Sequence, residues 1–215
     1  MSEVAVFGSI ASMVGQLLEA AGSVVGYRHG TEEPDHSVEK LTDNVEIRRY
    51  GARIAAETTV RADEESARNA GFRRLARYIF GANRDSQKIA MTAPVEQHTG
   101  EDEDVATAVA NSPSDNADWV IRFFMPADKT LESLPVPDDA EIRLVPLPPE
   151  TMAVRRFSGS RSASAVAAQA AELLSTLRDH GFEATDTPAA WFYDPPWTVP
   201  PLRRNEIAVP VKRTG

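Results

Sequence analysis

The sequence contains no cysteine among its 215 residues. Disulfide bonds, thiolate metal ligands and cysteine nucleophiles are therefore excluded. It also lacks any run of about 18 or more apolar residues, so no transmembrane helix is predicted. A phosphate-binding glycine loop, the ligand spacing of a zinc site and the serine elbow of a hydrolase are absent as well. Histidine is scarce, and three of the four histidines lie in polar linker or helix-end positions where solvation is typical: His29, His36 and His180.

Acidic residues outnumber basic ones by 32 to 23, which gives a net charge of −9 and a pI of about 5.0. This balance argues against general nucleic-acid binding and against attachment to an anionic membrane. The length and the 42% share of hydrophobic residues fit one globular domain. The apolar N-terminus lacks a basic n-region, so we expect no signal peptide and a cytoplasmic location.

Residues 1–37 are predicted to form an amphipathic helix and a polar linker, ahead of a domain that spans residues 38–215. Apolar residues gather on one side of the helix: Val6, Ile10, Met13, Val14, Leu17, Leu18 and Ala21. Such a helix could dock on its own domain, pair with another subunit in a homo-oligomer, or lie at a membrane interface. The membrane is the least favoured option, because the polar face of the helix is not basic.

The strongest helix signal covers residues 64–80. At about 100° per residue its apolar residues form one stripe, made of Phe72, Leu75, Ala76 and Ile79, with Arg68, Arg73 and Arg77 at its edges. Asp63 is the predicted N-cap and Gly81 the predicted stop. The stripe could simply pack on a sheet, with arginines that snorkel to solvent. Alternatively, part of it could line a groove for a flat apolar ligand, with arginines for its acidic groups.

Strand-like patterns occupy most of the remaining domain. They are Val45–Tyr50, Arg53–Val60, Ile89–Val95, Trp119–Met125, Ile142–Val145, Met152–Phe157, Phe182–Thr185, Ala189–Tyr193 and Asn205–Val211. A second helix with a serine cap is predicted at Ala163–Asp179, and His98–Asp118 is interpreted as a mobile acidic insertion. The order predicts an α+β fold: two βαββ halves that form a distorted eight-stranded antiparallel β-barrel with two flanking helices.

Three long segments carry a family resemblance: VEIRRYGARIAAETTV (Val45–Val60), FRRLARYIFGANRDSQKIAMTAPV (Phe72–Val95) and WFYDPPWTVPPLRRNEIAVPV (Trp191–Val211). Together with RFFMP at Arg122–Pro126 and RRFSG at Arg155–Gly159, they resemble the SOUL haem-binding protein family. The resemblance covers nearly all of the chain beyond the N-terminal helix. It implies the same two-half barrel and the binding of haem or another tetrapyrrole at a hydrophobic face near the first domain helix.

The resemblance also implies which residues contact the tetrapyrrole. On the first domain helix the matching positions are Phe72, Leu75, Ala76 and Arg77, with Asn69 one turn earlier. The apolar stripe and its basic edge add Arg68, Arg73 and Ile79 to the candidate site. The position that matches a histidine proposed as an iron ligand in one family member is Arg49 here. The position of a basic residue in the proline-rich loop is Thr198. His98, at the start of the predicted insertion, is the remaining candidate for the metal. We therefore expect haem to bind with weak or no axial ligation, in a carrier, buffer or sensor role.

Two other functions stay open from the residues. An enzyme on the same scaffold could act on a tetrapyrrole or hydrolyse a small electrophile, with Glu206 and Tyr193 as candidate groups. In the structural alternative, Glu206 is paired with Arg203 or Arg204, and Asp194 stabilises a turn. A pure interaction protein, assembled through the N-terminal helix, is the third possibility.

Overall fold

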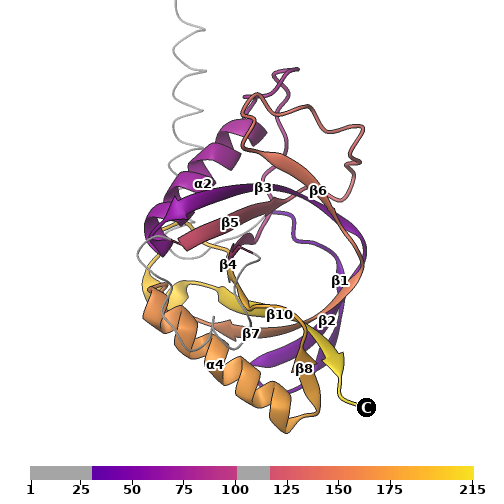
Figure 1. The fold of residues 1–215 in the computed structure, drawn as a ribbon, viewed down its shortest axis with the longest axis vertical. Coiled ribbons are helices and arrows are strands. Elements are labelled where there is room, and N and C mark those ends of the chain that lie inside the picture. Colours follow the sequence, from indigo (N-terminus) through magenta and orange to yellow (C-terminus); the bar gives the residue numbers. More distant parts are fainter. Residues whose placement is uncertain (1–30, 101–116) are drawn as a thin grey trace, which may run out of the picture.

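The computed structural model describes residues 31–100 and 117–215. Figure 1 shows one curved sheet with two helices on its outer side. The elements are β1 (His36–Lys40), β2 (Val45–Tyr50), β3 (Arg53–Ala62), α2 (Glu64–Ile79), β4 (Val95–Thr99), β5 (Ala117–Phe124), β6 (Arg143–Leu147), β7 (Glu150–Phe157), α4 (Ala163–Asp179), β8 (Phe182–Ala184), β9 (Ala189–Phe192), the 3-10 helix η1 (Pro200–Leu202) and β10 (Asn205–Arg213). The predicted N-terminal helix and most of the predicted insertion lie outside the described residues.

The sheet is antiparallel and open. Nine strands follow the order β1-β2-β7-β10-β9-β4-β5-β3-β6, and β8 pairs with β10. The α+β class and the two flanking helices are confirmed, but the expected barrel is not closed. In residues 31–100 and 117–215, β1 and β6 are the edges and do not pair with each other. Pro146 lies within β6, and a proline suits an edge because it has no N–H to offer a further strand.

The topology contains a ββαββ unit that occurs twice, and the first strand of each unit pairs with a strand of the other unit. One unit is β2-β3-α2-β4-β5, and the other is β6-β7-α4-β9-β10. In the first unit β5 lies between β3 and β4, and in the second β10 lies between β7 and β9. The leading strand of each unit pairs in the other unit, β2 with β7 and β6 with β3. β4 and β9 join the units at the centre of the sheet.

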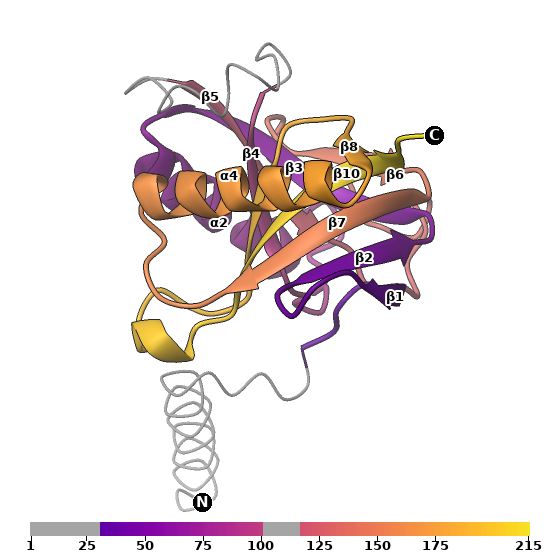
Figure 2. The ribbon, with the colours of Figure 1, turned by 90° about the horizontal axis from the view of Figure 1, so that it is seen from below.

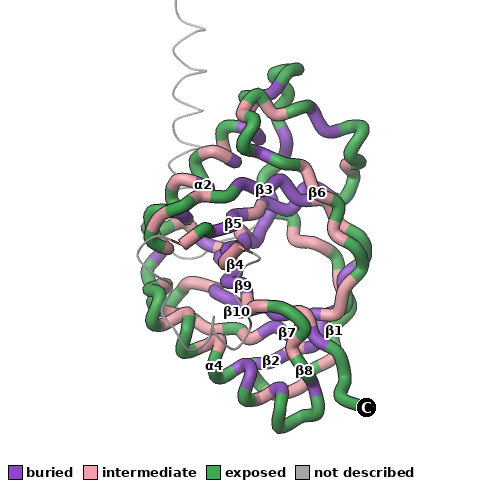
Figure 3. The backbone as a smooth tube through the Cα atoms, viewed as in Figure 1, coloured by how far each residue is buried: buried purple, intermediate pink, exposed green. Residues whose placement is uncertain are grey.

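Three apolar clusters hold the layers together. α2 packs on β3 and β5, and α4 packs on β7, β8 and β10, which Figure 2 shows from the α4 side. Leu75 and Ile79 of α2 pack in one cluster with Ile121 and Phe123 of β5. Leu173 and Leu177 of α4 pack in another with Ile207 and Val209 of β10. A third cluster lies on the other face of the sheet and includes Tyr50, Phe124, Met152 and Trp191. Figure 3 shows the buried positions along the strands, with much of the outer surface of α4 exposed.

The region before β4 corrects one predicted strand. The pattern predicted a strand at Ile89–Val95, whereas β4 begins only at Val95. Pro94 has no N–H for a ladder, and the Ala93–Pro94 peptide bond is cis. The preceding residues make single contacts instead, such as the 2.8 Å hydrogen bond from Ile89 N–H to the carbonyl of Ile79 at the end of α2. His98 consequently lies within β4 rather than at the start of an insertion.

No helix among the described residues is long and apolar enough to cross a membrane.

Candidate functional site

The helix α2 begins and ends where its capping residues place it. The Asp63 carboxylate accepts a hydrogen bond from the backbone N–H of Ser66 at 2.9 Å, as an N-cap does. Glu64 and Glu65 follow in the first turn, where the helix dipole favours negative charge. At the other end Gly81 takes a φ of 114°, a conformation that glycine adopts readily. The cap at Asp63 and the stop at Gly81 are confirmed.

The predicted apolar stripe of α2 is divided between core and surface. Leu75 and Ile79 are 0% and 1% exposed and belong to the core below the helix. Phe72 is 37% exposed, and its ring meets Phe123 edge-on with centroids 5.3 Å apart. Ala76 lies one turn beyond Phe72 and is half-buried. Phe72 and Ala76 are therefore the members of the predicted stripe that keep solvent-accessible surface.

Basic residues border the exposed part of α2. Arg77 has 71% of its side chain exposed, with Asp139 at 3.7 Å. Arg73 is also exposed, and its Nε donates to the backbone carbonyl of Asn69 at 3.2 Å. Such solvent-exposed contacts cost little to exchange for a ligand, since surface ion pairs contribute about 0–1 kcal/mol. Arg74, by contrast, is occupied by Glu141, Asp139 and Thr58.

Arg68 lies deeper, one turn before Phe72. Only 15% of its side chain is exposed, and Nη1 donates to Oε1 of Gln97 on β4 at 3.2 Å. Its guanidinium carbon is 5.0 Å from the centre of the Phe192 ring on β9. Glu64 lies 3.6 Å away on the preceding turn. Arg68 therefore connects the α2 surface to the joint between the two units, where β4 meets β9.

The structure does not bring His98 together with the α2 residues. Its Nδ1 lies 3.2 Å from Oε1 of Glu96, and its side chain is 15% exposed. Gln97, the neighbour of both residues in the strand, donates instead to the carbonyl of Glu64 in α2. Because side chains alternate across a strand, His98 lies on the face of the sheet opposite to α2. Among the described residues, no group of three or more histidine, aspartate or glutamate side chains could hold a metal ion.

The face of the sheet away from the helices carries a network of buried charges. Glu96 accepts hydrogen bonds from Nη1 of Arg122 at 2.9 Å and from Nε1 of Trp191 at 2.8 Å. Arg122 also donates to Glu57 at 2.6 Å. Burial by itself would raise the pKa of Glu96. The hydrogen bond to His98, the charge of Arg122 and the Trp191 N–H outweigh burial, and they lower the pKa to about 2.

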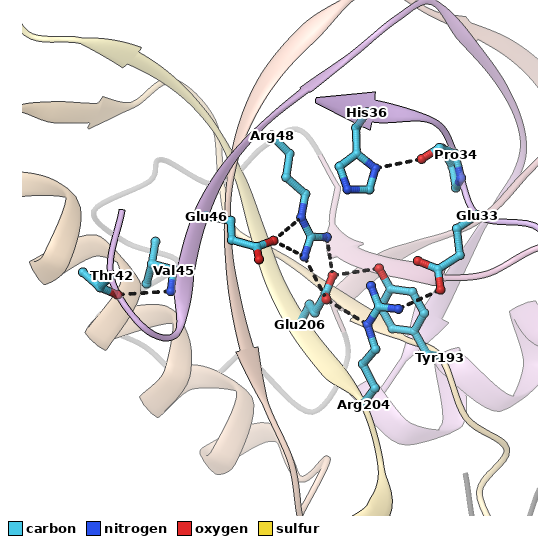
Figure 4. Close-up of polar contacts among 10 residues, drawn as sticks. All are labelled: Glu33, Pro34, His36, Thr42, Val45, Glu46, Arg48, Tyr193, Arg204 and Glu206. Carbon is cyan, nitrogen blue, oxygen red and sulfur yellow. Dashed lines mark hydrogen bonds and ion pairs between the residues drawn. The ribbon is translucent and has the colours of Figure 1, made fainter. Parts of the chain in front are cut away.

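A second buried carboxylate, Glu206, lies at the centre of Figure 4. It is 0% exposed and accepts from Arg48 at 2.8 Å, from Arg204 at 2.9 Å and from the Tyr193 hydroxyl at 2.7 Å. Burial opposes these partners, yet they lower the pKa of Glu206. Burial, followed by the repulsion of Glu206, raises the pKa of Tyr193 well above its ordinary value. Arg204 also reaches Glu33 at 2.7 Å. The predicted pairing of Glu206 with Arg204 is confirmed, and both enzyme candidates are engaged in this network.

Sequence reasoning did not single out Glu57, Glu96 or Arg122. They stand at polar positions of alternating strands, and such positions ordinarily face solvent. In this curved sheet Glu57 and Glu96 are buried and Arg122 is half-buried, and each charge is paired with another. The available signal was that acidic and basic residues occupy facing polar positions, because Glu57 and Glu96 are both in register with Arg122.

Two interlocked ββαββ units with helices on one side of an antiparallel sheet define the class of fold. The C-terminal domain of EcmrR shares it, with a TM-score of 0.58 at 14% identity over 83% of this chain and 98% of that domain. A protein from Listeria innocua described as a hydrolase shares it with a TM-score of 0.53 at 12% identity, over 79% of this chain and 92% of that one. At these identities the likeness concerns the fold alone.

The sequence places the chain in one family of this class. The family model of the SOUL heme-binding proteins matches residues 31–210, and the chain belongs to that family. Human heme-binding protein 2 is 31% identical over 137 residues, which cover 63% of this chain and 62% of that protein. Bovine heme-binding protein 1 is 29% identical over 160 residues, covering 73% of this chain and 76% of its own. The match thus spans somewhat less than two thirds of the human relative.

Proposed function

We propose that this protein binds haem or a related tetrapyrrole on the exposed part of α2. Phe72 and Ala76 would contact the ring, while Arg68, Arg73 and Arg77 would face its carboxylates, with Asn69 between them. Membership of the SOUL heme-binding family supports haem as the ligand, and the names of the human and bovine relatives agree with it. If the chain binds the tetrapyrrole without converting it, its role would be that of a carrier, a buffer or a sensor.

The observation that carries the proposal is the position of Phe72. A phenylalanine that is 37% exposed, backed by Phe123 and bordered by guanidinium groups, offers apolar area to one side of a flat ligand and positive charge to its edge. Apolar burial contributes about 25 cal/mol per Å², less the costs of association. Leu75 and Ile79 support the surface from below and are not part of the contact.

The residues fit the ring and its carboxylates better than they fit the iron. His98, the histidine proposed as a candidate ligand, lies on the opposite face of the sheet and is engaged by Glu96. Binding through apolar contact and carboxylate pairing would be nearly indifferent to the metal. When bound, haem would supply a redox-active iron, and the residues of this chain would hold and orient the porphyrin ring.

The test is a pair of titrations of the full chain, one with haem and one with metal-free protoporphyrin IX, followed by the change in the Soret band. We expect the two dissociation constants to agree within about tenfold, or about 1.4 kcal/mol. A spectrum of protein purified from a haem-replete culture would show whether the ligand is retained in cells. Haem binding that is far tighter than porphyrin binding would contradict the proposed mode, and no binding of either compound would contradict the proposed function.

A further inference from the structure

Two arginines from different units lie against one buried phenylalanine. The guanidinium carbon of Arg161, just before α4, is 5.4 Å from the centre of the Phe192 ring, and that of Arg68, in α2, is 5.0 Å from the same centre. Phe192 is 4% exposed and lies on β9, the strand at the joint between the units. Both positive charges are thus brought to the place where the beginnings of the two helices meet the central strands.

The charges around Arg161 are not balanced. Its Nη1 donates to the backbone carbonyl of Asp194 at 3.0 Å, a neutral partner. Burial, and after it the repulsion of Arg203 and Arg68, lower its pKa to about 10, although Asp194 and Glu65 act in the opposite direction. Burial likewise lowers the pKa of Arg68, and Glu64 compensates only in part. The cluster would therefore gain from an additional negative charge.

A buried side-chain amide on the strand next to Phe192 finds no hydrogen-bond partner in the described part of the chain. Asn205 on β10 is directly opposite Phe192 in the antiparallel ladder, so the two side chains share one face of the sheet. Asn205 is 0% exposed, and neither its Nδ2 nor its Oδ1 has a hydrogen-bond partner among the residues that the structure describes. Leaving such a group unsatisfied costs about 1–3 kcal/mol. An amide that can donate, opposite a phenylalanine whose ring lies near two guanidinium groups, is suited to an anion and to the water that accompanies it.

We propose that Arg161 and Arg68 form an anion site above Asn205 that receives a carboxylate of the bound tetrapyrrole. This inference rests on the proposed function and adds Arg161, from the second unit, to a contact otherwise confined to α2. The spacing suits it, because Phe72 follows Arg68 by four residues, or about 6 Å along the helix. A ring on Phe72 could thus extend a propionate toward Phe192. Ligand binding would then depend on both units.

The experiment compares protoporphyrin IX with its dimethyl ester, which presents the same ring without negative charge. The variants are Arg161→Gln, Arg68→Gln and the charge-preserving Arg161→Lys. Arg178→Gln is the control, since Arg178 is an exposed arginine in the last turn of the same helix. We expect Arg161→Gln and Arg68→Gln each to weaken binding of the diacid by about tenfold and of the ester by less than twofold. Arg161→Lys should retain most of the affinity, and Arg178→Gln all of it.

A second measurement does not need a porphyrin. Inorganic phosphate should raise the melting temperature of the unmodified chain and of Arg178→Gln, and it should raise that of Arg161→Gln much less. An equal loss for the diacid and the ester, or no loss for either, would overturn the anion site while leaving porphyrin binding in place. If neither porphyrin binds but phosphate still stabilises the chain through Arg161, the proposed function fails and the anion site stands. If phosphate also has no effect, both fail.

Discussion

Gln97 and His98 are neighbours in β4, yet their side chains lie on opposite faces of the sheet. Nε2 of Gln97 donates to the carbonyl of Glu64 in α2 at 2.9 Å, while Nδ1 of His98 lies 3.2 Å from Glu96 in the buried charge network. The alternation of side chains along a strand fixes this difference, and the pairing of His98 with Val120 fixes the register. A ligand bound at the site proposed on α2 would thus be separated from the imidazole by the sheet.

The replacement His98→Ala should consequently leave haem affinity within about twofold of the unmodified chain. Its effect should appear in stability, because Glu96 loses one of the groups that favour its charged form. Soret titrations of both chains measure the affinity, and urea unfolding measures the stability. A loss of haem affinity of tenfold or more, with protoporphyrin affinity unchanged, would show that His98 ligates the iron.

The local elements of the fold were predictable from the sequence because their signals are local. The caps at Asp63 and Ser162 are short polar side chains that precede apolar stripes, and both accept the expected N–H. The strand predicted before Val95 was wrong because Pro94 ends the ladder that its apolar neighbours suggest. The prediction of a closed barrel was also wrong. Closure depends on whether β1 and β6 meet, which no short-range pattern records.

The site was predictable only in part. Periodicity places Phe72, Leu75 and Ile79 on one stripe, but it does not say which of them the sheet covers. That depends on how closely α2 approaches β5. Arg161 carried no signal, because it precedes a helix and meets Phe192 only after the two units combine. The face occupied by His98 required the register of β4, which depends on a distant strand.

The close approach of α2 to β5 depends on Gly71. A Cβ at this position would lie 2.4 Å from Cγ1 and 2.8 Å from Cβ of Ile121, which is far inside van der Waals contact. Gly71→Ala should therefore destabilise the fold by about 1–3 kcal/mol through overpacking. This is expected although alanine favours a helix by about 1 kcal/mol over glycine. Unfolding of Gly71→Ala, Ile121→Ala and the double variant forms the test. The double variant should be more stable than the sum of the two losses predicts, and simple additivity would argue against the clash.

Replacement of Phe72 should separate binding from folding. Phe72→Ser removes the exposed ring that faces the proposed ligand, so haem and protoporphyrin affinity should both fall by at least tenfold. Stability should fall by only about 1 kcal/mol, mainly through the lost contact with Phe123. Val38→Ser on the edge strand β1 is the control, because Val38 is also an exposed apolar residue at 52% exposure. If Val38→Ser weakens binding as much as Phe72→Ser, the affinity reflects nonspecific adsorption to apolar surface.

Acid stability should depend on Glu96. Its pKa in the folded chain is lowered to about 2 from an ordinary value near 4.5, so its ionised form stabilises the fold. That stabilisation is fully present above about pH 4.5 and is lost as the pH falls toward 2; at 1.36 kcal/mol per pKa unit it amounts to about 3 kcal/mol. Glu96→Gln keeps an acceptor for Trp191 but removes the charge. It should lower the free energy of unfolding at pH 7 by about 2–3 kcal/mol and flatten the decline of that free energy between pH 4.5 and 2.

Glu46→Gln is the control, because Glu46 is a partly exposed partner of Arg48, and this variant should retain the decline. A variant at Glu96 that keeps both the stability and its acid dependence would mean that the Glu96–Arg122 pair contributes no net stabilisation, and that its role is to fix how β4 and β5 align.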